Sequence, residues 1–160
     1  MAEQSQDEAA IWHRRFGVEC NNAAWRLAEA ASRTPAEDEE MLHSAHAAAL
    51  HWGRIGTPLH AARAEMLLGH VHALLGNGQL AVRYARAAYD YVMAHDSAPW
   101  EIAFAHAVLA NAAHAAGDAR THATEYATAA EQGSALGNDE ERAIFTATFC
   151  RITMPAGDAQ

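Results

Sequence analysis

Apolar residues recur at helical spacing along almost the whole of this chain. Alanine and leucine occupy most apolar positions, β-branched residues are sparse, and apolar and polar residues do not alternate as they would along a half-buried strand. Turn residues divide this pattern into separate segments. We therefore predict an all-α chain of seven helices, over about residues 6–32, 36–53, 58–75, 79–95, 99–116, 118–135 and 139–153.

Helix boundaries carry residues that cap helices or form turns. The segment "TPAE" at 34–37 has the spacing of a capping box with proline in the first turn, and "GTP" at 56–58 repeats this arrangement. The segments "GNG" at 76–78 and "GD" at 117–118 indicate tight turns between helices. Short connections of this kind predict that consecutive helices pack against each other.

A period of 41 residues relates the helices in pairs. Leu27-Ala28, Leu68-Gly69 and Leu109-Ala110 follow one another at this step, each in the first helix of a pair. The same step separates small residues of the second helices, turn glycines and opening prolines: Ala47, Ala88 and Ala129; Gly76 and Gly117; Pro58 and Pro99. A fixed period of this length is typical of a solenoid built from helical hairpins.

The segments "LLGHVHALLGNGQLAVRYARAA" at 67–88 and "VLANAAHAAGDARTHATEYATAA" at 108–130 resemble the tetratricopeptide-repeat superfamily. Each has a leucine and a small residue in the first helix, a turn glycine, and small residues in the second helix, where helices approach to about 8–10 Å. The period exceeds the family's usual length of about 34, and Thr34-Pro35 replaces the first turn glycine. The resemblance implies a right-handed α-α superhelix of about three hairpins with a closing helix.

The resemblance extends over about residues 20 to 153 and implies one domain, TPR-like in its repeats. A chain of 160 residues with 51% apolar content can bury one such core. The domain we expect covers residues 1–153, followed by a flexible tail, with these parts: repeats at about 20–55, 58–96 and 99–136, a half repeat at 139–153, and the tail at 154–160.

In solenoids of this kind the first helix of each pair lines a concave groove in which ligands bind. Carried onto this chain, the groove-facing register comprises Asn22, Trp25, Glu29, Arg63, Met66, His70, Phe104, Asn111 and His114. In the first two of these helices the residues recur at i, i+3 and i+7, and so form one stripe. Each stripe mixes polar with large apolar residues, which favours binding over packing. The resemblance thus implies a protein-interaction or scaffold module for a peptide or partner helix.

The alternative is a small-molecule or metal-binding protein, with or without enzymatic activity, that uses the same groove. Arg63 would orient a carboxylate and His70 would move a proton. His72 and His106, by contrast, fall at helix-packing positions. An open, continuous groove would favour a peptide, and a closed pocket with converging polar side chains would favour a small molecule.

The second predicted helix carries the one metal-like spacing in the sequence. Glu40, His43 and His46 follow the Glu-x-x-His pattern of di-iron bundles, which need two copies and further carboxylates, whereas this chain has one copy. The sequence contains no zinc-type Cys-His set, phosphate-binding loop or nucleophile elbow. We therefore expect no resident metal and no cofactor, and a non-enzymatic role is favoured over an enzymatic one.

Net charge and hydropathy exclude some classes of binding partner. The net charge of −9 arises from 20 acidic and 11 basic residues, none of them lysine, so we expect no nucleic-acid partner. No apolar run reaches the ~18 residues of a membrane span, and the acidic first ten residues lack the features of a secretory signal. We expect a cytoplasmic protein without a membrane partner. The apolar segment 148–154 lacks a polar cap, which leaves a homodimer open beside a protein or peptide partner.

Overall fold

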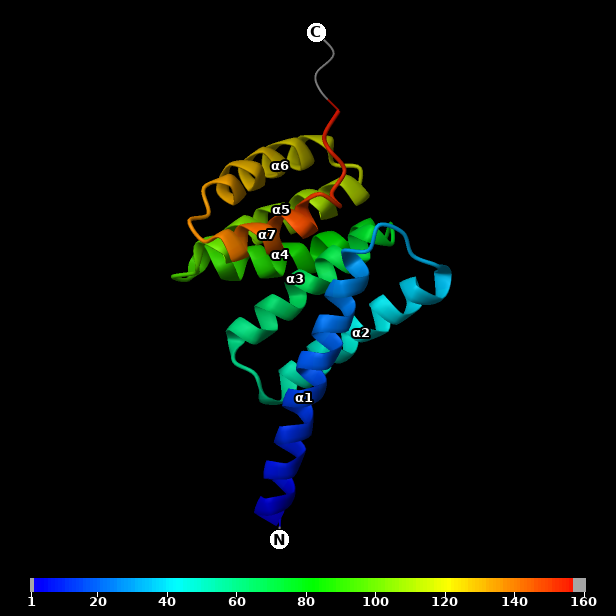
Figure 1. The fold of residues 1–160 in the computed structure, drawn as a ribbon, viewed down its shortest axis with the longest axis vertical. Coiled ribbons are helices and arrows are strands. Elements are labelled where there is room, and N and C mark those ends of the chain that lie inside the picture. The colour runs from blue at the N-terminus through cyan, green and yellow to red at the C-terminus, as the bar shows by residue number, and fades with distance from the viewer. Residues whose placement is uncertain (1, 157–160) are drawn as a thin grey trace.

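The computed structural model describes residues 2–156, with side chains from residue 8 onward, as seven helices (Figure 1). These are α1 (Ala2–Ala28), α2 (Pro35–Ile55), α3 (Pro58–Leu74), α4 (Gly78–Ala94), α5 (Pro99–Ala115), α6 (Ala119–Ser134) and α7 (Asp139–Phe149). No strand occurs among the described residues, and the predicted all-α fold is confirmed. The largest boundary differences are at α1 and α7, each of which ends four residues before its predicted end.

The helices form three hairpins, α1–α2, α3–α4 and α5–α6, whose members make the most extensive contacts in the molecule. The odd-numbered helices also contact one another in order, α1 with α3, α3 with α5, and α5 with α7. No corresponding contact series joins α2, α4 and α6 in the described part of the chain. The hairpins therefore stack as an all-α superhelix in which α1, α3, α5 and α7 share the inner face.

The second and third hairpins use the same turn, 41 residues apart. Gly76 and Gly117 have φ angles of 74° and 77°. After them, the Asn77 N–H donates to the carbonyl of His72 at 2.8 Å, and the Asp118 N–H donates to that of Ala113 at 2.9 Å. These bonds close a Schellman turn, whose positive φ favours glycine because it has no Cβ. The spacing of the two glycines therefore reflects a repeated backbone geometry.

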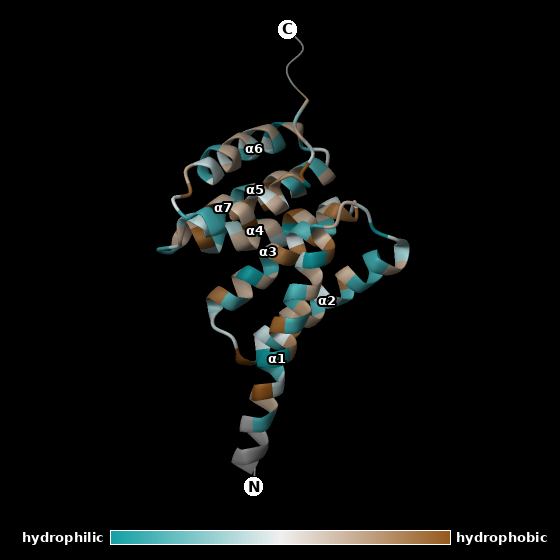
Figure 2. Cartoon of the chain, in the orientation of Figure 1, coloured by the Kyte–Doolittle hydropathy of each residue, from teal (hydrophilic) through white to brown (hydrophobic). Residues whose placement is uncertain are grey.

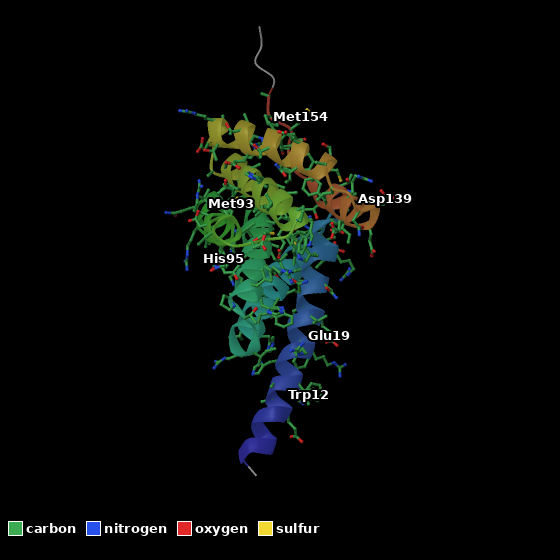
Figure 3. All side chains as sticks on the ribbon, turned by 90° about the vertical axis from the view of Figure 1, so that its left-hand side faces the viewer. Trp12, Glu19, Met93, His95, Asp139 and Met154 are labelled. Carbon is green, nitrogen blue, oxygen red and sulfur yellow. The ribbon has the colours of Figure 1, made fainter. Side chains whose placement is uncertain are left out.

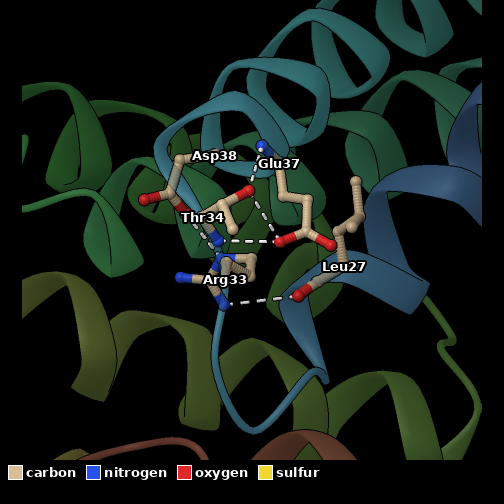
Figure 4. Close-up of polar contacts among 5 residues, drawn as sticks. All are labelled: Leu27, Arg33, Thr34, Glu37 and Asp38. Carbon is tan, nitrogen blue, oxygen red and sulfur yellow. Dashed lines mark hydrogen bonds and ion pairs between the residues drawn. The ribbon is translucent and has the colours of Figure 1, made fainter.

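The first hairpin has a longer connection that side chains stabilise (Figure 4). Arg33 donates to the carbonyl of Leu27 at 3.2 Å, near the end of α1, and to the carboxylate of Asp38 at 2.6 Å, in the first turn of α2. The Glu37 N–H donates to the Thr34 hydroxyl at 3.3 Å, and the Thr34 N–H donates to the Glu37 carboxylate at 2.7 Å. The predicted capping box is therefore present.

The inner helices α3 and α5 are buried along most of their length, and the middle of the molecule carries mainly apolar colours in Figure 2. The core consists of two clusters, one around α1, α2 and α3 and the other extending from α3 to α7, and Trp25 packs against both. At the α3–α4 crossing Gly69 lies directly against the backbone of Ala85. The small residue in the Leu68-Gly69 pair therefore permits close helix packing.

The remaining features of the fold concern membrane crossing and the two ends of the described chain. None of the helices in residues 2–156 combines the length and apolar character that a membrane crossing requires. Residues 154–156 are not helical, and the remainder of the predicted tail, 157–160, lies outside the described residues. At the other end, α1 extends past the end of α2, so its N-terminal half stands out from the body (Figure 1).

Candidate functional site

The inner face contains a hollow of about 390 Å³, which we call the inner hollow. All four odd-numbered helices contribute to it: its lining residues are Asn21, Trp25, Glu29, Arg63, Met66, Trp100, Phe104, Ile144 and Thr148. Five of the nine predicted groove residues belong to this set, namely Trp25, Glu29, Arg63, Met66 and Phe104. The sequence register therefore brings residues from three hairpins to one place, although their binding of a ligand stays a prediction.

Aromatic rings form one wall of the inner hollow. Phe104 makes edge-to-face contacts with Trp25 at 5.9 Å and with Trp100 at 6.0 Å between ring centroids. Behind it, Phe145 of α7 makes a third such contact at 5.5 Å. Because Phe104 is held from three sides, its ring and the two tryptophans present a rigid apolar surface. Such a surface can accept an aliphatic or aromatic group without first having to reorganise.

Arg63 supplies a fixed positive charge beside this apolar wall. Its Nε donates to the carboxylate of Glu101 at 2.8 Å, and its guanidinium carbon lies 5.2 Å from the ring centroid of Trp100. Glu101 is buried and also accepts from the Ala98 N–H at 3.1 Å, at the start of α5. The Arg63 side chain is nevertheless 43% exposed. Its terminal N–H groups therefore remain available to a carbonyl or carboxylate in the hollow.

Helix α7 closes one side of the inner hollow. The Thr148 hydroxyl donates at 3.2 Å to the carboxylate of Glu29, the residue that follows α1, and this bond joins α7 to the end of α1 across the inner face. One turn earlier on α7, Ile144 lies at the rim and is 53% exposed. The contact between the first and last helices means that the inner face is bounded at this end, while the opposite end continues between α1 and α3.

A second hollow of about 220 Å³, the outer hollow, adjoins the first between α1 and α3. It shares Asn21 and Arg63 with the inner hollow, and its other lining residues are Val18, Asn22, Trp52, His60 and Ala64. Among them, the rings of Trp52 and His60 stack at 4.6 Å. The predicted groove residue Asn22 therefore lies here. We call the two hollows together the trough, since Arg63 and Asn21 line both.

His70 does not face the trough as predicted, and this is a correction. The side chain is fully buried, with its ring stacked on Trp25 at 5.6 Å. The amide nitrogen of Asn111 lies 3.1 Å from its Nδ1, while its Nε2 has no hydrogen-bond partner among the described residues. Asn111, which was also predicted to face the groove, is buried as well and lines neither hollow, which is a second correction. His70 and Asn111 are one period of 41 residues apart, so they hold equivalent positions on α3 and α5 and lie against each other.

Burial has a strong electrostatic effect on His70. Loss of hydration lowers the pKa of its imidazole to about 4, and the positive charge of Arg33 acts in the same direction. The ring is therefore neutral at neutral pH, when its Nδ1 can accept a hydrogen bond from the Asn111 amide. A buried, neutral imidazole behind Trp25 does not fit the proton-transfer role predicted for it, because that role requires contact with a ligand.

His114 also lies outside the trough, which is the third correction. It is exposed near the end of α5, and its ring centroid is 4.9 Å from that of His122 on α6. Both line a separate hollow that residues 153–156 partly cover. The two predicted packing histidines do pack: His72 stacks on Tyr84 at 5.6 Å, and His106 lies 2.6 Å from the Glu125 carboxylate.

The metal-like spacing on α2 does not converge on one point. Glu40 lies 3.8 Å from Arg26, His43 is exposed, and the His46 ring contacts the rings of His72 and Tyr84. Within the described residues, no group of three or more His, Cys, Asp or Glu side chains is arranged to hold a metal ion.

Sequence reasoning did not select four residues of the inner hollow: Asn21, Trp100, Ile144 and Thr148. Two of them lie on α7, which the prediction treated only as a closing helix. The period itself contains the missing signal, because Thr148 lies two steps of 41 residues beyond Met66, and Ile144 lies three steps beyond Asn21. Extending the groove register into the half repeat would therefore have identified Thr148, but not Ile144, because Asn21 was itself outside the predicted register.

Comparison with known proteins gives no match. No model of a known protein family fits this chain, and no curated protein or solved structure is similar enough to it to indicate a relationship.

Proposed function

We propose that this protein is a TPR-like binding module that holds an extended peptide segment of a partner protein in the trough. The observation that carries the proposal is the adjacency of the two hollows, which share the lining residues Asn21 and Arg63. An extended segment can therefore run from the Phe104 wall to the stacked pair of Trp52 and His60. The contacts between successive inner helices, together with the repeated turns, support the TPR-like assignment.

The lining suggests how such a segment is recognised. The inner hollow, with Met66 and three aromatic rings, takes an apolar anchor side chain of the peptide, because burial of that side chain favours binding. Arg63 pairs with a backbone carbonyl or an acidic side chain next to the anchor. Asn21 and Asn22 offer amide groups to the peptide backbone, which supplies affinity that depends little on sequence.

The Ile144→Glu variant tests this proposal with little risk to the fold, because Ile144 is exposed at the rim of the inner hollow. Peptides selected from a random library against the wild-type protein are expected to bind the variant at least about tenfold more weakly, since a carboxylate replaces apolar surface at the anchor site. The measurement is fluorescence anisotropy of labelled peptides, titrated with each protein.

Leu50→Glu is the matched control, because Leu50 is 57% exposed on α2 and does not line the trough. It should leave peptide affinity unchanged. If the library yields no peptide, or if both variants bind the selected peptides as tightly as the wild type does, the trough is not a peptide site.

The second candidate is a small-molecule site, favoured by the contact of α7 with α1 at Thr148 and Glu29. The inner hollow alone lies within the range of about 300–1,000 Å³ typical of such sites. Aromatic carboxylates are the matching probe, because Arg63 lies beside the aromatic wall. They should raise the unfolding temperature of the wild type, as followed by thermal shift, and the Arg63→Gln variant should lose this stabilisation. No rise in the wild type, or an equal rise in both proteins, would remove this candidate.

A further inference from the structure

The N-terminal half of α1 exposes large apolar side chains that line neither hollow of the trough. Ile11 is 66% exposed and Trp12 is 52% exposed, and Phe16 stacks on Trp12 at 5.8 Å. This part of α1 stands out from the body, and Figure 3 shows Trp12 on it. A contiguous apolar patch on a projecting helix is costly for an isolated molecule in water, and it is typical of an interaction surface.

The opposite side of this helix packs on the body. Gly17 approaches the ring of Trp52 so closely that an added Cβ would lie 3.0 Å from it, and His13 lies 2.8 Å from His51. These contacts fix the rotation of α1 about its axis. Ile11 and Trp12 therefore remain largely exposed to solvent, and Ile11 also lines a hollow beside Ile55, the last residue of α2.

Charged residues of opposite sign flank Ile11 and Trp12 along α1. Glu8, Ile11, Trp12 and Arg15 recur at i, i+3, i+4 and i+7, so they form one stripe along the outward side of α1. The acidic residue lies one turn before the apolar pair, and the basic residue lies one turn after it. Arg15 also pairs with Glu19 at 2.8 Å, and its guanidinium lies over Trp12 at 5.5 Å, which directs it along the stripe.

We propose that this stripe is the contact between two copies of the chain, with their α1 helices antiparallel. A two-fold axis between Ile11 and Trp12 brings both apolar pairs into one centre, because a symmetric contact uses the same patch on both copies. The same axis sets Glu8 of one copy opposite Arg15 of the other, twice. The charge order is thus self-complementary, and this singles out a second copy as the partner.

The surroundings are compatible with this arrangement. Because α1 projects from the body and the helices run antiparallel, the two bodies lie at opposite ends of the contact (Figure 1). The stripe from Glu8 to Glu19 spans roughly 17 Å at 1.5 Å per residue. Two helix segments of this length bury less area than the ~1,600 Å² of a standard interface, so we expect the dimer to be weak. The trough begins further along α1, at Val18.

Sedimentation velocity of the full chain over a concentration series, at about 0.15 M salt, tests the proposal by charge exchange. The wild type is expected to show a monomer–dimer equilibrium. Glu8→Arg and Arg15→Glu should each raise the dissociation constant at least about tenfold, because each places like charges opposite each other. An equimolar mixture of the two variants should restore dimers, since every pair across the contact is then opposite in charge.

Trp12→Glu should also give monomers, and Leu50→Glu, at a similarly exposed apolar residue, should dimerise like the wild type. Monomeric wild type at all concentrations would overturn the proposal, as would a mixture of the two charge variants that stays monomeric. Loss of the dimer in a Met154→Glu variant, with Trp12→Glu unaffected, would place the contact at the C-terminal end instead and would equally overturn it.

Discussion

Acidification from pH 7 to pH 4 is expected to lower the free energy of unfolding by about 3 kcal/mol through His70 alone. Its imidazole has a pKa of about 4 in the folded protein and about 6.5 in the unfolded chain. The unfolded state therefore binds the proton first, and stability falls as the pH drops below about 6.5. The fall continues until the pH reaches the folded pKa, below which both states carry the proton.

Comparison with His70→Gln isolates this contribution from other titrating groups. Glutamine can keep a hydrogen bond to Asn111, but it does not titrate. Chemical unfolding at a series of pH values should show the variant less stable than the wild type at pH 7, because it loses the stacking on Trp25. The difference should shrink by about 3 kcal/mol by pH 4. A difference that stays constant over this range would show that His70 is not the group responsible.

Gly69→Ala is expected to destabilise the protein by about 2–3 kcal/mol, although alanine is the better helix former. The new methyl group would lie 2.8 Å from the backbone nitrogen of Ala85 and 3.1 Å from its Cβ. Backbone atoms cannot rotate away as a flexible side chain can, so α3 and α4 would have to separate. Thermal or chemical unfolding measures the loss directly.

Gly53→Ala on α2 is the matched control, with the opposite expected sign. An added Cβ at Gly53 has no neighbour within 4 Å, and the residue lies within the helix. Removal of the glycine should therefore stabilise the protein by roughly 0.5–1 kcal/mol. Equal effects of the two substitutions would contradict the close α3–α4 approach on which this account depends.

The candidate site was predictable where it depends on the repeat register. Trp25, Arg63, Met66 and Phe104 could be placed on one face because residues at equivalent positions of successive repeats have equivalent surroundings. Arg63 and Phe104 are themselves separated by the 41-residue period. The same reasoning extended to α7 would have added Thr148, which lies two periods beyond Met66.

The repeat register did not predict how deeply each side chain is buried. His70 and Asn111 have groove-facing positions by spacing, yet both are buried: the indole ring of Trp25 stacks on His70, and Asn111 lies against His70. Which side chain lies in front depends on the sizes and rotamers of residues from three helices, and no local pattern contains that information. His114 was misplaced for a related reason, since the superhelix carries the end of α5 away from the trough.

The sequence by itself determined the seven helices, their pairing into hairpins and the 41-residue period, because capping residues, turn glycines and helical spacing act over short distances. Only the tertiary structure decided that Thr148 of α7 reaches Glu29 at the end of α1, that Glu101 holds Arg63, and that Asn21 and Arg63 lie together between two hollows. Each of these contacts joins residues at least 38 positions apart. Such contacts depend on how whole helices pack against one another, which local patterns do not specify.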